Sequence, residues 1–150
     1  MENNETLKVE TVYSEELIES LGKDFLEKML PLQTFEDACK LFGINNFIVD
    51  FSCFPEKDRK SMESHAKVVI ITNAVNRLAN DGDEWIADFD DASQDKYEIW
   101  WDKLSSGFRF LDCDCWHTLS TVGSRLCYIS PDAGEYVAVQ FNDIFNDWLK

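Results

Sequence analysis

Basic residues are scarce in this sequence, and their scarcity argues against one large class of functions. Lysine and arginine together number 14, against 29 aspartate and glutamate residues, which gives a formal net charge of -15. Direct binding to a phosphate backbone is disfavoured, because that affinity comes from lysine and arginine releasing counterions. The same charge would attract a protein with a basic surface, although it would also simply keep an acidic protein dispersed.

Long apolar runs are missing as well. No stretch reaches the ~18 apolar residues of a membrane span, so no membrane association is expected. The first ten residues, MENNETLKVE, have neither the basic start nor the apolar run of a signal peptide. The five cysteines are an odd number, which favours free thiols in a reducing cytosol. The sequence also lacks glycine-rich nucleotide motifs and the EF-hand pattern, and we expect no cofactor.

The apolar content is nevertheless sufficient for a core. Hydrophobic residues make up 45% of the 150 residues, which predicts one domain over 1–150. Residues 1–12 are expected to be a loose polar start that contributes a short strand through LKVETVY. The spacing of apolar residues predicts a helix from Ser14 to Pro31, a short helix capped by Thr34, and a long helix over 57–81. Residues 44–54 are expected to form a strand or a buried loop.

The second half is aromatic and alternating, which is typical of strands. Strands are predicted near 85–89, 96–102, 107–116 and 124–129, although the segment around 97–104 would also fit a helical face. Ser130-Pro131-Asp132 is a strong helix start and predicts one closing helix. The expected fold is therefore α+β: a helical N-terminal half, an antiparallel sheet of about four strands covered on one face by helices, and a closing C-terminal helix.

The stretch between residues 108 and 130 suggests two small sites. In a strand, Cys113, Cys115 and His117 would share one face and are possible zinc ligands, but their spacing is wide for a tetrahedral site and inward packing is the alternative. Asp112 and Asp114 would raise the pKa of a neighbouring thiol, which argues against cysteine catalysis. Ser124 and Arg125, with Trp116, could hold a nucleotide-like or sugar-like anion; alternatively they belong to an ordinary hairpin turn.

A third candidate is the acidic and aromatic tract after residue 80. Interleaved acids and aromatics suit a binder of a basic protein surface, while a solvated acidic face and aromatic core residues are the simpler alternative. The predicted interaction face consists of six residues: Trp85, Asp88, Asp90, Asp91, Trp100 and Trp101.

From Trp85 to Phe141 the sequence resembles a family of small, functionally uncharacterised proteins encoded by phages and prophage-like elements of gut bacteria. The resemblance is carried, in order, by the segments WxADF, QDKYEIWW, GFRF, CWHTLSTVGSRLCY and EYVAVQF, and in the N-terminal half by TFEDACKxxG. DKYEIWW lacks the proline that often precedes the aromatic in that family. Cys113 and His117 are not part of the family pattern, which weakens the zinc interpretation.

The resemblance implies a phage origin and no established enzymatic activity. It favours a non-enzymatic protein that binds a host or phage protein in the bacterial cytoplasm. The alternatives are a small-ligand binder that uses Ser124 and Arg125, and a virion or cargo component.

Overall fold

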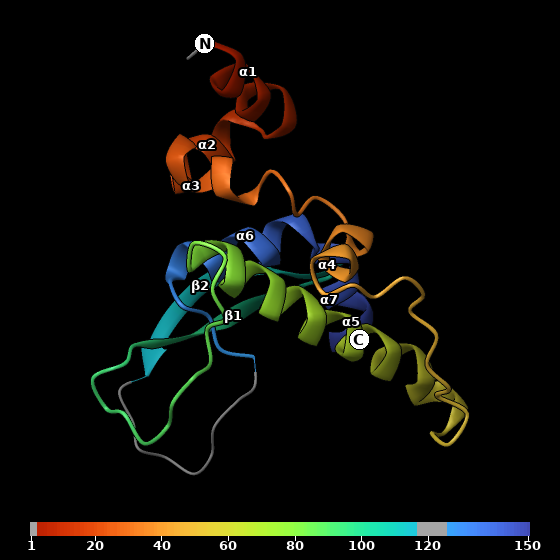
Figure 1. Ribbon diagram of the computed structural model, residues 1–150. Coiled ribbons are helices and arrows are strands. Elements are labelled where there is room, and N and C mark those ends of the chain that lie inside the picture. Colours follow the sequence, from red (N-terminus) through yellow and green to blue (C-terminus); the bar gives the residue numbers. More distant parts are fainter. Residues whose placement is uncertain (1–2, 117–125) are drawn as a thin grey trace.

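The computed structural model describes the backbone of residues 3–116 and 126–150, and the side chains of residues 8–115 and 126–150. In this part of the chain, seven helices accompany one two-stranded antiparallel sheet (Figure 1). The elements are α1 (Asn3–Val12), α2 (Glu15–Leu21), α3 (Lys23–Met29), α4 (Phe35–Leu41), α5 (Glu56–Ala79), β1 (Lys96–Leu104), β2 (Gly107–Trp116), α6 (Pro131–Gln140) and α7 (Asn142–Leu149). The α+β class is confirmed, whereas a sheet of about four strands is wrong for the described residues.

The first residues form a helix, so the strand expected within LKVETVY is wrong. Val9 and Tyr13 are both buried and lie four residues apart, on the side that faces the core. The Tyr13 hydroxyl lies 3.3 Å from the Tyr136 hydroxyl of α6, and Gln33 Nε2 donates to both hydroxyls. This polar network ties the N-terminal helices to the C-terminal part of the chain.

The single helix expected between Ser14 and Pro31 is broken in two. Ser14 caps α2 as predicted, because its Oγ accepts the Leu17 amide at 3.3 Å. Gly22 has a φ of 78°, a conformation that a helix interior cannot contain and that glycine adopts without steric cost. The chain therefore turns at Gly22 and restarts as α3.

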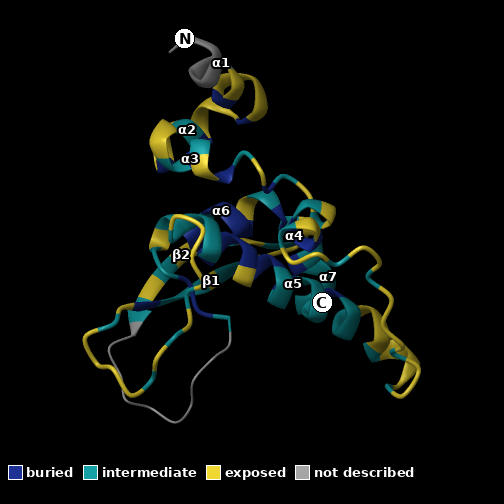
Figure 2. Ribbon diagram, in the orientation of Figure 1, coloured by how far each residue is buried: buried dark blue, intermediate teal, exposed yellow. Residues whose placement is uncertain are grey.

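The middle of the chain contains one correct and one incorrect prediction. The long helix is confirmed as α5, and it buries Val68, Ile71 and Val75. The segment between α4 and α5 is neither a strand nor buried. Ile48 is 86% exposed and Val49 is 50% exposed, and the segment lies at the projecting end of α5 (Figure 2).

The two central strands of the predicted sheet form a hairpin. β1 and β2 are joined by a two-residue turn between Leu104 and Gly107, with a register shift between Trp100 and Trp101. The predicted strand at 85–89 is wrong, because side-chain hydrogen bonds fold this segment into a closed loop. Of the predicted strand at 124–129, the described residues 126–129 pair with β1 only at the bridge between Tyr97 and Tyr128.

The closing helix starts where the sequence predicted, with Ser130 Oγ accepting the Ala133 amide at 3.2 Å. It breaks at Phe141, whose φ of -112° is not helical, and continues as α7. Buried residues gather where α5, α6 and the hairpin meet (Figure 2). Among the described residues, no helix has the length and apolar character needed to cross a membrane.

Candidate interaction face on the hairpin

The hairpin has an inner face that enters the core and an outer face that does not. Tyr97, Ile99 and Trp101 pack against the core cluster, and the Trp101 ring lies 4.8 Å from the Phe145 ring of α7. Because side chains alternate along a strand, Lys96, Glu98 and Trp100 point to the outer face. Trp101 was predicted in the interaction face together with Trp100; it is partly buried and lies on the inner side of the hairpin, opposite to Trp100.

The outer face exposes two large apolar side chains among acids. Trp100 is 51% exposed and Leu111 is 58% exposed. Leu111 is the extra residue that the register shift leaves in β2, and such bulges commonly redirect a side chain. Across the ladder, Asp112 lies opposite Trp100 and Asp114 lies opposite Glu98. The result is an apolar pair bordered by carboxylates.

A loop built around a buried lysine covers one end of this outer face. Lys96 is fully buried, and its Nζ donates to the carbonyl oxygens of Asp91 at 2.9 Å and Gln94 at 2.8 Å. The same ammonium lies 5.6 Å from the centre of the Phe89 ring. Gln94 in turn accepts the Asp88 amide at 2.6 Å and donates to the Ile86 carbonyl at 3.1 Å. These bonds hold the loop closed and direct its acids outward.

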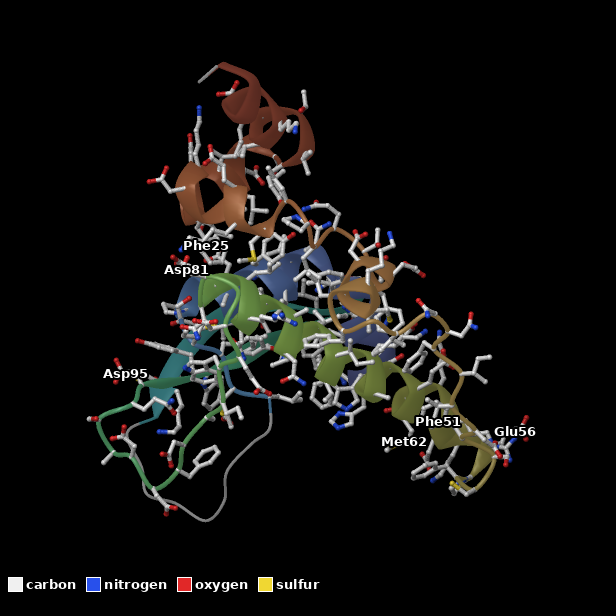
Figure 3. All side chains as sticks on the ribbon, viewed as in Figure 1. Phe25, Phe51, Glu56, Met62, Asp81 and Asp95 are labelled. Carbon is white, nitrogen blue, oxygen red and sulfur yellow. The ribbon has the colours of Figure 1, made fainter. Side chains whose placement is uncertain are left out.

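The predicted loop acids are all exposed. Asp88 Oδ1 accepts the Asp90 amide at 2.9 Å, and Asp91 Oδ1 accepts the Ser93 amide at 2.8 Å. The hydrogen bonds to Ser93 lower the pKa of Asp91, so this carboxylate keeps its charge to a lower pH than an ordinary aspartate. The loop and its neighbour Asp95 project from the end of the hairpin that is distant from α7 (Figure 3).

Trp85 lies apart from Trp100, at the base of the same loop. It lines a hollow of about 460 Å³ together with Ile86 and Phe89 of the loop and Asn73 of α5. Trp85 is half-buried, whereas Ile86 is 68% exposed. The tryptophan therefore supports the base of the loop and borders the exposed surface.

We define the acidic–aromatic face by the outward side chains of the loop and of the hairpin. Its members are Asp88, Asp90, Asp91, Glu98, Trp100, Leu111, Asp112 and Asp114. Sequence reasoning missed Glu98, Leu111, Asp112 and Asp114. Glu98 lies two residues before Trp100, so both side chains point to the same face of a strand. The residues opposite them in β2 are Asp114 and Asp112, so the acids could have been predicted from the alternation and the hairpin pairing. The bulge that exposes Leu111 leaves no comparable signal in the sequence.

The cysteines of β2 belong to the inner face. Cys113 lies against Gly134 of α6, so closely that a Cβ added at Gly134 would overlap the sulfur. Burial, and then the neighbouring Asp112 carboxylate, raise the pKa of the Cys113 thiol to about 12. A thiol in this setting remains protonated and is a poor nucleophile. Cys113 is thus a packing residue.

None of the residues that the structure describes form a cluster of three or more metal-ligating side chains. His117, the third residue of the zinc hypothesis, lies outside the described residues. Ser124 and Arg125 of the predicted anion site also lie outside them. The backbone of Trp116 ends β2 opposite Lys96. The anion site therefore stays a prediction from the sequence.

The rate of reaction with a thiol reagent should differ between the exposed Cys53 and the half-buried Cys113. Cys53 is exposed in the segment before α5, so it should react first with a disulfide reagent at about pH 8. Cys113 should react about a hundredfold more slowly, because it is buried and protonated. Changing Cys53→Ser should remove the fast phase, which a kinetic thiol titration would detect. Loss of a fast phase in Cys113→Ser would contradict the assigned environment.

Replacing Lys96 by methionine should loosen the loop with little effect on the hairpin. Methionine retains the buried apolar stem but donates no hydrogen bond to the Asp91 and Gln94 carbonyls. We expect a loss of about 1 kcal/mol in unfolding free energy and faster proteolytic cleavage within residues 86–95. Lys103→Met, on an exposed lysine of the same strand, is the matched control. Equal cleavage rates in the two variants would contradict the role of Lys96.

Comparison of the chain with family models, curated proteins and solved structures returned no match. Function is therefore inferred from the geometry of the face.

Proposed function

We propose that this chain is a non-enzymatic, phage-type interaction protein that binds a host or phage protein with a basic surface in the bacterial cytoplasm. The observation that carries the proposal is the juxtaposition of Trp100 and Leu111 with acids on the outer face of the hairpin. Large aromatic and aliphatic side chains that remain exposed among charged residues are typical anchors of protein interfaces.

The charge of the face supports a basic partner. The eight residues of the acidic–aromatic face include six acids and no base. Two basic side chains of the hairpin are engaged within the chain: Lys96 is buried beneath the loop, and Arg109 pairs with Asp102 at 2.8 Å. Complementary charge would steer a basic protein to this face, and desolvation of Trp100 and Leu111 would then supply affinity.

A capture experiment with matched variants tests the proposal. The wild-type protein would be immobilised and exposed to a lysate of a gut bacterium, and retained proteins would be quantified by mass spectrometry. Trp100→Ser/Leu111→Ser removes the apolar pair of the face. Ile48→Ser/Val49→Ser removes another exposed apolar pair, from the segment before α5, and serves as the control.

We expect one protein with a basic surface to be retained by the wild type and by the control variant, and lost from the face variant. Both substitutions alter exposed side chains, so the melting temperatures should stay close to wild type. Equal retention by the face variant and the wild type would contradict this use of the hairpin.

A further inference from the structure

The free edge of β1 carries a partly used set of backbone hydrogen-bonding groups. The amide of Tyr97 donates to the Tyr128 carbonyl at 3.1 Å, and the amide of Tyr128 donates to the Tyr97 carbonyl at 2.8 Å. Tyr97 therefore directs both of its backbone groups away from β2. Because backbone groups alternate along a strand, Ile99, Trp101 and Lys103 direct theirs to the same side.

These three residues have no hydrogen-bond partner on that side among the described residues. Residues 126–129 pair with β1 only at Tyr128, so the described part of the third strand makes a single bridge. The register shift inserts its extra residue into β2, and β1 itself remains regular. Within the described structure, an edge about three residue pairs long is thus left available between Ile99 and Lys103.

The opposite edge of the hairpin is protected. Asn146 of α7 accepts the Phe108 amide at 2.7 Å and donates to the Phe108 carbonyl at 2.8 Å. Further along β2, Asp112 Oδ1 accepts the Cys113 amide at 2.8 Å, and Asp114 Oδ1 accepts the Cys115 amide at 2.9 Å. Side chains that occupy edge amides prevent strand addition. Only β1 combines available backbone groups with an adjoining hollow in the described structure.

That hollow lies directly beside the β1 edge. It measures about 350 Å³ and is bordered by Glu98 and Tyr128, and its other lining residues are apolar: Ile99, Trp101, Leu126, Phe145, Trp148 and Leu149. It lies on the inner side, where the odd residues of β1 place their side chains. A strand added to β1 would place every second side chain into this mainly apolar hollow, because directly opposed residues share a face.

The alternate side chains of such a strand would lie on the outer face. Their neighbours on β1 are Glu98, the exposed Trp100 ring and Asp102, with Asp112 and Asp114 one strand further. A lysine or arginine at these positions would meet carboxylates, and could also lie over the Trp100 ring as a cation–π pair.

From this geometry we infer that β1 accepts an extended segment of the basic partner as an added antiparallel strand, with apolar residues in the hollow and basic residues outward. The inference rests on the proposed function, since it takes the partner to be basic. It adds that the partner binds through an extended segment paired with β1. The backbone bonds supply affinity, and the alternation of apolar and basic side chains supplies specificity.

Methylated peptides test the added strand without altering the protein. The probe is a fluorescently labelled peptide of about seven residues in which lysine and valine alternate. Residues opposite Ile99 and Trp101 have inward side chains and direct their amides at β1. These are the valines, so N-methylation of the valines removes the bonds to β1, whereas N-methylation of the lysines modifies solvent-facing amides. All three peptides carry the same charge.

We expect the valine-methylated peptide to bind about tenfold more weakly than the unmodified one, and the lysine-methylated peptide to bind with nearly unchanged affinity. The amides of Ile99, Trp101 and Lys103 should exchange hydrogen rapidly in the isolated protein and slowly with the unmodified peptide bound. Equal affinities for the three peptides would show binding by charge alone and would overturn strand addition while leaving the proposed function intact. Absence of binding, or protection of these amides in the isolated protein, would also overturn it.

Discussion

Replacing Asn76 by aspartate is expected to lower the free energy of unfolding near pH 7 by about 3 kcal/mol. Asn76 is 2% exposed, donates its Nδ2 to the Cys127 carbonyl at 2.7 Å, and accepts the Ile129 amide at 2.9 Å. Aspartate keeps the acceptor for Ile129, loses the donor, and turns a negative charge toward the Cys127 carbonyl. The substitution therefore disrupts the hydrogen bonds that hold the neighbours of Tyr128, and with them Tyr128, beside β1.

The destabilisation by Asn76→Asp should depend on pH. Burial would raise the pKa of the introduced carboxyl in the folded protein above the value of about 3.9 in the unfolded chain. A group with a raised folded-state pKa destabilises the fold fully above that pKa, and the loss shrinks as pH falls toward the unfolded value. Urea unfolding of variant and wild type at about pH 7 and about pH 5 measures the difference. Asn76→Ala should show no such pH dependence relative to wild type, and a pH-independent loss in Asn76→Asp would contradict a buried position.

Adding a methyl group at Gly134 is expected to cost about 2 kcal/mol of unfolding free energy, despite the better helix propensity of alanine. The new Cβ would overlap Cys113 Sγ and press α6 away from the hairpin. Cys113→Ala removes that sulfur, so Gly134→Ala should cost clearly less in the Cys113→Ala background. A double-mutant cycle measured by urea unfolding should give a favourable coupling of about 1–2 kcal/mol. Additive effects of the two substitutions would contradict the close packing of α6 on β2.

The elements predicted correctly from the sequence are those in which local and tertiary preferences agree. The four-residue spacing of apolar side chains gave α5, and Thr34 with Asp37 gave the start of α4, where both halves of a capping box form. The hairpin followed from alternation and the serine-rich turn before Gly107. Each of these signals lies within one element.

The errors arise where tertiary contacts override local pattern. The alternating WIADF segment resembles a strand, yet Lys96 and Gln94 bond to the backbone of this region and close it into a loop. The helices break at Gly22 and Phe141, and the short helices on either side of each break pack around the core. The spacing of apolar residues in the sequence continues through both positions and does not indicate either break. The four-residue spacing of Val9 and Tyr13 could have predicted α1.

The sequence predicted which residue types form the interaction face, but not which side of the hairpin each of them occupies. Adjacent residues in a strand point to opposite sides, so the sequence showed that Trp100 and Trp101 must separate. It did not show which of them packs against the core. That depends on the contact between Trp101 and Phe145, which are distant in the sequence. The pairing of Glu98 with Asp114 likewise depends on the register of the hairpin.

The most direct test of the account is the salt dependence of capture by wild type and an acid-reversed variant. Asp90→Lys together with Asp112→Lys reverses two exposed acids of the face, while Asp58→Lys with Asp143→Lys changes the net charge equally elsewhere. We predict that the partner is retained at about 0.1 M salt and weakened at about 0.5 M, where charges are screened. The face variant should bind weakly with little dependence on salt, and the control variant should behave nearly as the wild type. The same retention and salt dependence in all three proteins would contradict a basic partner on the acidic–aromatic face.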